Sequence, residues 1–324
     1  MDIYNYVIDD TKEIPHYFDF DKESICFIDI ETTGLNKSNN FIYLLGMLYF
    51  DQNSSSWNIT QYFIDNLKEE KDLLHQFNDM IKKFKIIITF NGESFDIPFI
   101  KHRMSKYMKS NNIDNLLSFD IYKKLKEERP FLNLKNYKLK TIEETLGIYR
   151  DDIISGKECI NLYYKYVKTK DKSLIDDILK HNHDDLYYLI DILKIFNIIH
   201  DSKTFYIQKS QDLIKIEIVS ISCDGDMFNI SCKTSKSNNI AYFGEHFNIR
   251  WDNKNLFIDF EYKKGLITPT KKCLFADVSS WNINNKLKDS SEYIVPNNIM
   301  LLKVEDKYEM DNLKKIVKES ILTI

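Results

Sequence analysis

The sequence predicts an α/β protein in which a mixed β-sheet flanked by helices is followed by a smaller, β-rich (α+β) C-terminal domain. Short continuous apolar runs, at residues 25–28, 41–50 and 86–90, are typical of strands that are covered on both faces. Apolar residues at helical spacing dominate from there to about residue 197, and strand-like alternation follows after residue 212. The sequence thus has a group of strands first, and then a strand that alternates with helices. This order indicates one sheet between helical layers.

The first domain begins with three predicted strands. The run at 25–28 is followed by the run at 41–50, after a turn rich in Asn, Lys and Ser, and then by residues 56–64, which alternate in part. Residues 68–84 have apolar side chains at helical spacing, and the run at 86–90 predicts a further buried strand. We therefore expect a strand meander, a helix and a fourth strand in this order.

A change of pattern marks the predicted domain boundary near residues 198–212. Ile214, Ile216 and Ile218 alternate with charged residues, and further short strand-like runs precede a helical pattern at about 309–322. The predicted parts are an N-terminal extension at 1–23, an α/β domain at 24–198 and a β-rich domain of unknown role at 205–324.

Composition indicates a folded, soluble protein and excludes one class of function. Hydrophobic residues make up 43% and charged residues 29% of the 324 residues, which is ordinary for a protein with a sizeable core. Only eight glycines occur and no glycine-rich phosphate-binding motif is present, which excludes glycine-loop nucleotide binding. The five cysteines include no Cys-x-x-Cys pair, which predicts free thiols in a reducing compartment. Since no apolar run is long enough to cross a membrane, we expect a cytoplasmic protein without a membrane partner.

The net charge of −4 hides a basic segment at residues 101–140. This segment holds eleven Lys or Arg residues against four acids, which are Asp114, Asp120, Glu127 and Glu128. Such an excess suits a polyanionic partner such as nucleic acid, and it equally suits a solvated helix face in a lysine-rich protein. Charge alone does not decide between the two explanations.

Two carboxylates stand close together at the end of the first of these strands. Asp29 and Glu31 are two residues apart, so their side chains point to the same face of the strand. The simplest explanation is that the strand emerges into solvent there. Beside a covered sheet, however, two like charges repel each other and are costly to desolvate unless a cation neutralises them. A hard divalent metal ion is the natural partner of such a pair.

A third acidic residue stands at a strand-to-helix transition. Asp96 follows the strand that ends at Phe90, and Pro98 is tolerated in the first turn of the next helix. Open α/β sheets bind their ligands at such transitions. The competing explanation is a capping or turn role for Asp96, with Asn91 and Gly92 shaping the loop.

Polar residues interrupt the apolar stripe of the helix that is predicted at about 173–196. The stripe runs at steps of three or four residues through Leu174, Ile178, His181, Asp185, Leu189, Ile192 and Phe196. A carboxylate on a buried stripe needs a partner, and His181 lies one turn before Asp185 on the same face. The neighbouring His183 and Asp184 lie off the stripe, and a solvated face explains them.

In this order and on these elements, the three features resemble the motifs of the DEDD, or DnaQ-like, 3′→5′ exonuclease superfamily, which has the ribonuclease H-like fold. Residues 29–34, with the sequence Asp-Ile-Glu-Thr-Thr-Gly, resemble its first motif, residues 91–96 its second and residues 181–185 its third. The stretch 147–156, together with the third motif, looks most like the YprB-type ribonuclease H-like proteins. The resemblance covers roughly residues 24–196.

The resemblance implies a metal-dependent hydrolase that cleaves phosphodiester bonds, most simply a 3′→5′ exonuclease acting on a single-stranded 3′ end of DNA or RNA. Two Mg²⁺ or Mn²⁺ ions would be held by the four acids Asp29, Glu31, Asp96 and Asp185, with Asp29 bridging both ions. His181 would accept the proton of the attacking water. The resemblance also implies that substrate contacts Thr32, Thr33, Gly34, Leu35 and Asn91.

One position departs from the family pattern. Family members present a tyrosine four residues before the last aspartate or a histidine five residues before it, whereas His181 stands four residues before Asp185. Histidine suits a general base, because the free side chain titrates at about pH 6.5. The alternatives are that His181 only orients water or is a packed helix residue.

Two other functions stay open. A non-catalytic nucleic-acid-binding or scaffold protein would keep the fold, although the presence of all four carboxylates argues against it. A structure-specific endonuclease would share the metal site, since a fold does not fix the substrate. Three further features are candidates only: Asp120 for a supporting or structural role, Phe95 and Phe99 for base stacking or core, and the C-terminal domain for a protein partner.

Overall fold

The computed structural model describes residues 1–324 except 9–11, 16–17, 19, 133, 151–153 and 284–285. The chain divides into two compact units. Unit 1 comprises Met1–Lys126 and Leu134–Ile195, and unit 2 comprises Glu127–Asn133 and Phe196–Ile324.

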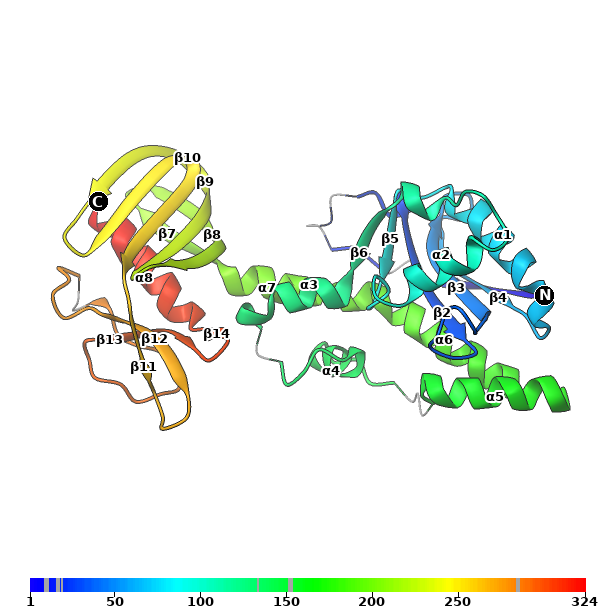
Figure 1. The fold of residues 1–324 in the computed structure, drawn as a ribbon. Helices are drawn as coiled ribbons and strands as arrows, with labels where there is room; N and C mark the ends of the chain where they lie inside the picture. Colours follow the sequence, from blue (N-terminus) through cyan, green and yellow to red (C-terminus); the bar gives the residue numbers. More distant parts are fainter. Residues whose placement is uncertain (9–11, 16–17, 19, 133, 151–153, 284–285) are drawn as a thin grey trace. The chain divides into compact units, whose positions relative to one another are not determined.

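Unit 1 is built on a six-stranded mixed sheet (Figure 1). Its strands are β1 (Asp2–Ile8), β2 (Ile25–Thr32), β3 (Ile42–Asp51), β4 (Ser56–Phe63), β5 (Ile86–Thr89) and β6 (Leu117–Asp120), in the spatial order β1-β4-β3-β2-β5-β6. The pairs β1–β4, β4–β3 and β3–β2 are antiparallel, whereas β2–β5 and β5–β6 are parallel. The strand that carries Asp29 and Glu31 therefore lies inside the sheet, where antiparallel pairing changes to parallel pairing.

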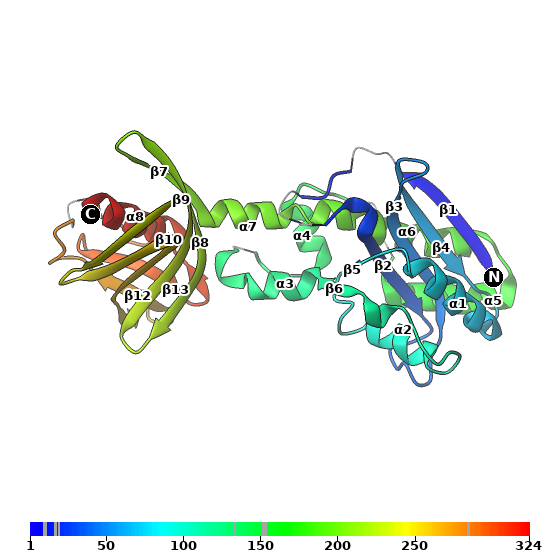
Figure 2. The ribbon, with the colours of Figure 1, turned by 90° about the horizontal axis from the view of Figure 1, so that it is seen from above.

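Helices cover both faces of this sheet, which explains why β2 and β3 are apolar on both sides. The helices are α1 (Glu70–Ile81), α2 (Asp96–Met104), α3 (Ile121–Glu127), α4 (Leu139–Thr145), α5 (Gly156–Thr169) and α6 (Ser173–Ile192), with 3₁₀ turns η1 (Lys22–Ser24), η2 (Leu67–Glu69) and η3 (Ile113–Asn115). Figures 1 and 2 show α1 and α2 over one face and α5 and α6 over the other.

Helix α6 approaches the sheet closely at Gly46 of β3. A Cβ atom at this position would lie 2.2 Å from Oδ1 of Asn182 and 2.5 Å from Cδ1 of Leu186, so the helix reaches this depth only over a glycine. In the sheet register, Gly46 pairs with Asp29 on one side and with Gln61 on the other. The close approach therefore brings polar residues of α6 beside Asp29.

Two edge strands differ from what the sequence predicts. Residues 2–8, which the sequence assigns to an N-terminal extension, form β1 and pair with β4. Residues 117–120, which lie in a stretch with helical patterns, form β6 and pair with β5. Both strands are largely exposed, so they lack the continuous apolar run that identifies a covered strand.

Unit 2 has the predicted α+β character. One antiparallel sheet has the order β10-β9-β8-β7, with β7 (Thr204–Lys209), β8 (Asp212–Asp224), β9 (Met227–Phe243) and β10 (Phe247–Glu261). The other has the order β11-β12-β13-β14, with β11 (Lys263–Leu266), β12 (Lys272–Asp277), β13 (Ile299–Val304) and β14 (Lys307–Tyr308). The remaining elements are η4 (Arg129–Phe131), α7 (Ile195–Lys203), which belongs to this unit from Phe196 onward, and α8 (Met310–Thr323).

Each unit has its own hydrophobic core. In unit 1 the rings of Tyr43 on β3 and Tyr163 on α5 stack with their centroids 4.0 Å apart. In unit 2, α8 buries Ile316 and Val317 in a core that it shares with both sheets. No helix in the described parts of the chain is both long enough and apolar enough to span a membrane.

Candidate functional site

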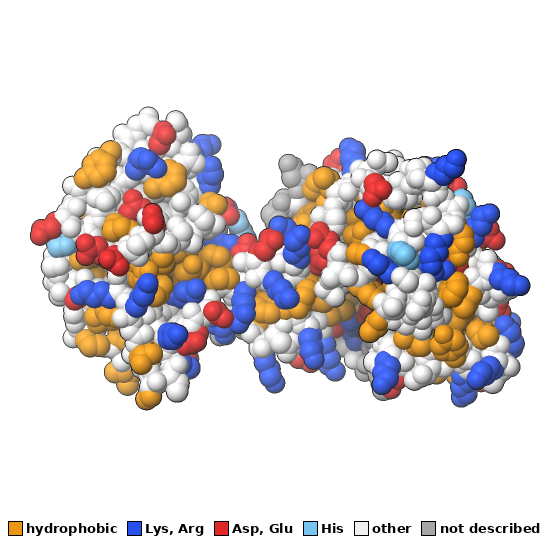
Figure 3. Space-filling view, in the orientation of Figure 1, with side chains coloured by type: hydrophobic (Ala, Val, Ile, Leu, Met, Phe, Trp, Pro, Cys, Tyr) orange, Lys and Arg blue, Asp and Glu red, His pale blue; other side chains and the backbone are white. Residues whose placement is uncertain are grey.

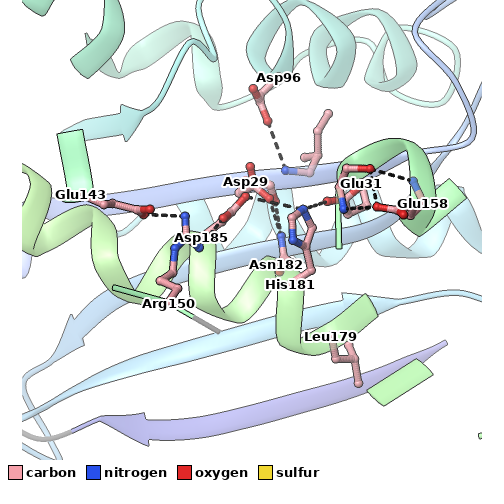
Figure 4. Close-up of polar contacts among 12 residues, drawn as sticks. Asp29, Glu31, Asp96, Glu143, Arg150, Glu158, Leu179, His181, Asn182 and Asp185 are labelled. Atoms are coloured by element: carbon pink, nitrogen blue, oxygen red, sulfur yellow. Dashed lines mark hydrogen bonds and ion pairs between the residues drawn. The ribbon is translucent and has the colours of Figure 1, made fainter. Parts of the chain in front are cut away.

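The candidate site begins with Asp29 and Glu31 near the end of β2. The apolar residues 25–28 place this strand inside the sheet, and the two carboxylates follow in the C-terminal half of the strand. Glu31 is only 8% exposed. In Figure 4 the side chains of Asp29 and Glu31 point toward residues of α6.

Asp96 reaches the same place from another element. It is the first residue of α2, and its Oδ1 accepts a hydrogen bond of 3.2 Å from the backbone amide of Ile30, which lies between the two carboxylates of β2. The loop before α2 is held by Asp120 at the end of β6, which accepts bonds of 3.0 Å from the backbone amides of Asn91 and Glu93. Asp120 therefore shapes the loop that presents Asp96.

Helix α6 supplies Asp185 and His181. Nε2 of His181 lies 3.6 Å from Oε1 of Glu31 and 3.8 Å from Oδ2 of Asp185. His181 and Asp185 are one helical turn apart, so both face the end of β2 (Figure 4). The structure thus brings together the five residues that the sequence indicates as catalytic.

Glu31 and Asp96 are buried, and Asp29 and Asp185 lie partly buried beside them. Burial raises the pKa of Asp29 well above its ordinary value, and the charges of Asp96, Asp185 and Glu31 raise it further. Burial also raises the pKa of Glu31 to about 8, against the opposing effect of His181. The pKa of Asp96 rises to about 7, again mainly through burial, although the amide of Ile30 lowers it. Acids in this state are costly to ionise without a cation, so the arrangement suits cation binding.

Asn182 is a site residue that the sequence reasoning missed. It is fully buried on α6, and its Nδ2 donates to Oδ2 of Asp29 at 2.7 Å. Its Oδ1 accepts a bond of 2.7 Å from Nε2 of Gln61 on β4, and this Nε2 also donates to the carbonyl of Leu179 at 2.9 Å. Both amides are thereby fixed, and so is the carboxylate of Asp29. The available signal was the helical spacing of Asn182 from Leu179 and Leu186, which places it on one face with these two apolar residues.

Arg150 is a second residue that the sequence reasoning missed. Its guanidinium lies 2.6 Å from Oδ1 of Asp185 and 2.5 Å from Oε1 of Glu143, and the side chain is 9% exposed. Although burial lowers the pKa of Arg150, these two acids raise it above its ordinary value. Arg150 belongs to the stretch 147–156 that resembles YprB-type proteins, of which residues 151–153 lie outside the described residues. It follows α4 in an irregular connection, where no periodicity marks a functional residue.

A thiol adjoins the cluster. Cys159 on α5 is fully buried, and its Sγ, one carboxylate oxygen of Glu31 and one ring nitrogen of His181 all lie within 4.8 Å of one another. A capping box between Ser155 and Glu158 fixes the first turn of α5 and hence the position of Cys159. The spacing of the cysteines gave no signal, because the neighbours of Cys159 come from other elements.

The end of β2 and the loop after it hold four of the residues that the resemblance assigns to the substrate. Thr32 and Thr33 are buried, and their hydroxyls bond within the loop: that of Thr32 donates to the carbonyl of Gly34 at 3.0 Å, and that of Thr33 accepts from the amide of Phe41 at 2.9 Å. Leu35, by contrast, is 83% exposed. The two threonines therefore shape the loop, and Leu35 is the side chain that it presents to solvent.

A hollow of about 440 Å³ lies between this loop and the loop after β5. Its lining includes Leu35 and Lys37 from one side and Phe95 and Phe99 from the other. Phe99 is buried in the core, whereas Phe95 is only half-buried. Asn91 is exposed in the second loop with a φ of 66°, and its Oδ1 accepts a bond of 2.7 Å from the hydroxyl of Ser94.

The basic segment at 101–140 is partly engaged in internal ion pairs. Arg103 is 2% exposed and its Nε donates to Oε1 of Glu70 at 2.8 Å, so it is a structural residue. Lys101 lies 2.6 Å from Asp114. On the face shown in Figure 3, Lys and Arg side chains are spread across unit 1 rather than gathered in one block.

Comparisons with known proteins agree with this architecture. A family model of the RNase_H superfamily matches residues 26–197, more than half of the chain. The uncharacterized protein YprB of Bacillus subtilis (strain 168) is 28% identical over 179 residues, which are 53% of this chain and 42% of YprB. DNA polymerase 1 of Sulfurisphaera ohwakuensis is 33% identical over 105 residues, which are 32% of this chain and 11% of the polymerase. The chain thus spans less than half the length of either relative.

Solved structures show a weaker likeness. E. coli exonuclease I in complex with a dA16 oligonucleotide matches 66% of this chain and 55% of its own with 12% identity and a TM-score of 0.32. The ExoI/SSB-Ct complex gives 11% identity and a TM-score of 0.34 over 65% and 55%. The family match confirms the predicted ribonuclease H-like fold, and the match to YprB confirms the predicted likeness to YprB-type proteins.

Proposed function

The chain belongs to the RNase H superfamily, and from this premise we propose that it is a nuclease that depends on divalent metal ions. One observation carries the proposal: β2, α2 and α6 bring four carboxylates together, and burial beside the other acids raises the pKa of Asp29, Glu31 and Asp96. Within this class, the order of the acids along the chain supports a 3′→5′ exonuclease of the DEDD type that hydrolyses DNA or RNA.

The donor atoms fit hard divalent cations such as Mg²⁺ or Mn²⁺. These ions prefer carboxylate oxygens, and cations would relieve the repulsion that raises the pKa of Asp29. We assign two ions to the four acids Asp29, Glu31, Asp96 and Asp185. When bound, such ions polarise the phosphoryl oxygen and offset the charge of the scissile phosphate.

His181 is the proposed general base. The proton of the attacking water passes to Nε2, which lies 3.6 Å from Glu31 and 3.8 Å from Asp185. The two carboxylates lie close enough to Nε2 to favour the charged imidazolium that forms by the transfer. The neutral ring must therefore carry its proton on Nδ1 before the reaction.

Three further residues hold the acids in place. Asn182 fixes the rotamer of Asp29 through its 2.7 Å bond, and Gln61 fixes Asn182 in turn. Arg150 ties Asp185 to the buried Glu143 of α4. Because these partners are buried, the acids keep their positions without a ligand, which lowers the cost of binding one.

The proposed substrate is a single-stranded 3′ end whose terminal nucleotide lies in the hollow between the loops after β2 and β5. Leu35 and Phe95 offer apolar surface for a base, and Lys37 offers a positive charge for a phosphate. Residues that line the hollow are close in sequence to residues of the site: Leu35 follows Glu31 by four residues, and Phe95 directly precedes Asp96.

The test is a cleavage assay on single-stranded DNA and RNA labelled at either end, with Mg²⁺, Mn²⁺ or EDTA. We expect successive shortening from the 3′ end that stops with EDTA, with Asp29→Ala and with Asp185→Ala. Asp184→Ala, the neighbouring acid of α6, is the matched control and should keep activity. Loss of activity in His181→Ala that is relieved at high pH supports its role as the base.

Each other outcome points to a different protein. Internal cleavage products would replace the exonuclease with an endonuclease that uses the same site. Binding of the strands without cleavage under any metal would contradict the catalytic proposal and favour a scaffold. Activity that survives both Asp29→Ala and EDTA would rule out the metal site.

A further inference from the structure

We propose that Glu31, Cys159 and His181 form a second kind of metal site, which binds a thiophilic divalent cation of the zinc class and so switches off the proposed nuclease. The inference about binding stands on the geometry of these three residues. The inference about regulation rests, in addition, on the proposed function.

The three side chains converge from three elements. Glu31 comes from β2, Cys159 from α5 and His181 from α6, and their nearest ligand atoms all lie within 4.8 Å of one another. A tetrahedral zinc site with Zn–N, Zn–O and Zn–S bonds of ordinary length places its ligand atoms roughly 3.3–3.6 Å apart. The 3.6 Å between Oε1 of Glu31 and Nε2 of His181 already meets this spacing, and the thiol lies within 4.8 Å of its two partners.

The donor set selects for soft and borderline cations. Thiolate and imidazole ligands favour Zn²⁺ and Cd²⁺, whereas Mg²⁺ and Mn²⁺ favour the oxygen ligands of the four acids. On binding, the Cys159 thiol releases its proton to solvent and its sulfur becomes a ligand. Three protein ligands leave the fourth coordination position for a water molecule. Because water is neutral, it adds no charge to the buried site.

Occupation of this site would remove two residues from the proposed reaction. Glu31 is shared between the carboxylate cluster and the thiol site, so a zinc-class cation would compete with the metal ions of the cluster for its oxygens. His181 would donate its Nε2 lone pair to the cation and could no longer accept a proton from water. A zinc-class ion would therefore inhibit by taking both the ligand and the base, without blocking the hollow at Leu35.

The experiment is a titration of the full chain with Cd²⁺, followed through the sulfur-to-cadmium charge-transfer band in the ultraviolet. All variants carry Cys223→Ser, because Cys223 is the exposed cysteine. We expect one band that saturates at one Cd²⁺ per chain, disappears in Cys159→Ser and weakens in His181→Ala. Cys26→Ala is the matched control, since Cys26 is equally buried in unit 1, and it should keep the band.

A band of full strength in Cys159→Ser would overturn the proposal, and so would Cd²⁺ binding without a thiolate signal in the parent protein. Circular dichroism of each variant checks that its fold is kept, and Cys159→Ser retains the size of the thiol. Loss of the band in Cys159→Ser and a weaker band in His181→Ala, each variant folded, support the site.

A second measurement tests the regulation. Zn²⁺ added to the Mg²⁺-supported cleavage reaction should inhibit, and Cys159→Ser should need at least about tenfold more Zn²⁺ for the same inhibition. Equal inhibition of both proteins would overturn the regulatory part. If the chain cleaves nothing under any metal, the proposed function fails, while the Cd²⁺ titration still decides the metal site.

Discussion

One aspartate in each unit has a strongly shifted pKa, and the two shifts have opposite directions. In unit 2, the pKa of Asp277 is held well below its ordinary value, chiefly because Asn298 and Ser279 donate hydrogen bonds to it. In unit 1, the pKa of Asp29 is raised well above its ordinary value, because it is buried beside three other acids. A carboxylate that accepts hydrogen bonds from neighbouring side chains stabilises the folded protein. A cluster of carboxylates that keeps an excess of negative charge can instead bind a cationic ligand.

The same contrast holds for the buried amides that bind these acids. Asn312 in unit 2 donates to Asp289 at 2.6 Å and to the carbonyl of Leu301 at 2.9 Å, and it ties α8 to β13. Asn182 in unit 1 donates to Asp29 at 2.7 Å, but the other oxygen of that carboxylate faces the cluster. One amide serves the stability of its unit, and the other orients a proposed metal ligand.

The largest expected effect comes from Asp96→Asn. Removing one charge from the cluster should lower cleavage by about three orders of magnitude, because a lost ligand removes several kcal/mol of transition-state stabilisation. It should also raise the unfolding temperature of the metal-free protein at pH 8, since less repulsion remains. Cleavage assays and thermal unfolding measure the two effects.

Asp120→Asn is the control for this variant. Asp120 accepts hydrogen bonds from three backbone amides, so its substitution should lower the unfolding temperature rather than raise it. If Asp96→Asn destabilised the metal-free protein as Asp120→Asn does, the contrast between ligand and structural acids would fail within unit 1.

The second effect separates the two buried amides. Asn182→Ala should weaken Mn²⁺ binding and cleavage by about 10- to 100-fold, the usual cost of losing a residue that orients a metal ligand. Asn312→Ala should lower the stability of unit 2 and leave Mn²⁺ binding unchanged. Calorimetric titration with Mn²⁺ distinguishes them, and equal Mn²⁺ affinities in the two variants would contradict the assigned role of Asn182.

The third effect is a dependence of stability on pH. In the unfolded chain Asp and Glu titrate at about pH 4, whereas in the folded metal-free protein the pKa of Asp96 is about 7 and that of Glu31 about 8. Between these values the folded state holds protons that the unfolded state has lost, so stability falls as pH rises from about 4 to 8. Thermal unfolding of unit 1 in EDTA should show this fall.

Metal ions should reverse that dependence. Mn²⁺ binds the deprotonated acids, so it should raise the unfolding temperature strongly at pH 8 and little at pH 5. An unfolding temperature in EDTA that rises over this pH range would show that the cluster is not repulsive in the folded state.

The smallest effect is expected for Asp277, whose carboxylate accepts hydrogen bonds from neighbouring residues. Asp277→Asn should lower the stability of unit 2 by no more than about 1 kcal/mol, because the side chain is partly exposed and its neighbours can bond to water. Since the pKa of Asp277 is lowered, its contribution is present above about pH 4 and is lost as pH falls. Cleavage activity should not change, and a change would mean that unit 2 contributes to the reaction.

The sequence by itself determined the central strands, the helices that cover them and the acids that they carry. The apolar run at 25–28 identifies a covered strand, and the alternation of side chains then places Asp29 and Glu31 on one face. Helical spacing likewise pairs His181 with Asp185. These features could be predicted because each depends on the side-chain periodicity of one strand or one helix. That periodicity can be recognised in a continuous stretch of sequence.

Only the tertiary structure decided which residues from different elements meet. The bond from Gln61 to Asn182 and on to Asp29 needs the close approach of α6 over Gly46. The ion pair of Arg150 with Asp185 and the proximity of Cys159 to Glu31 likewise join separate elements. The edge strands β1 and β6 were missed for the same reason, because backbone pairing, and not an apolar pattern, places them in the sheet. Hydrogen bonds and ion pairs between distant residues leave no period in the sequence, so they become visible only when the chain is folded.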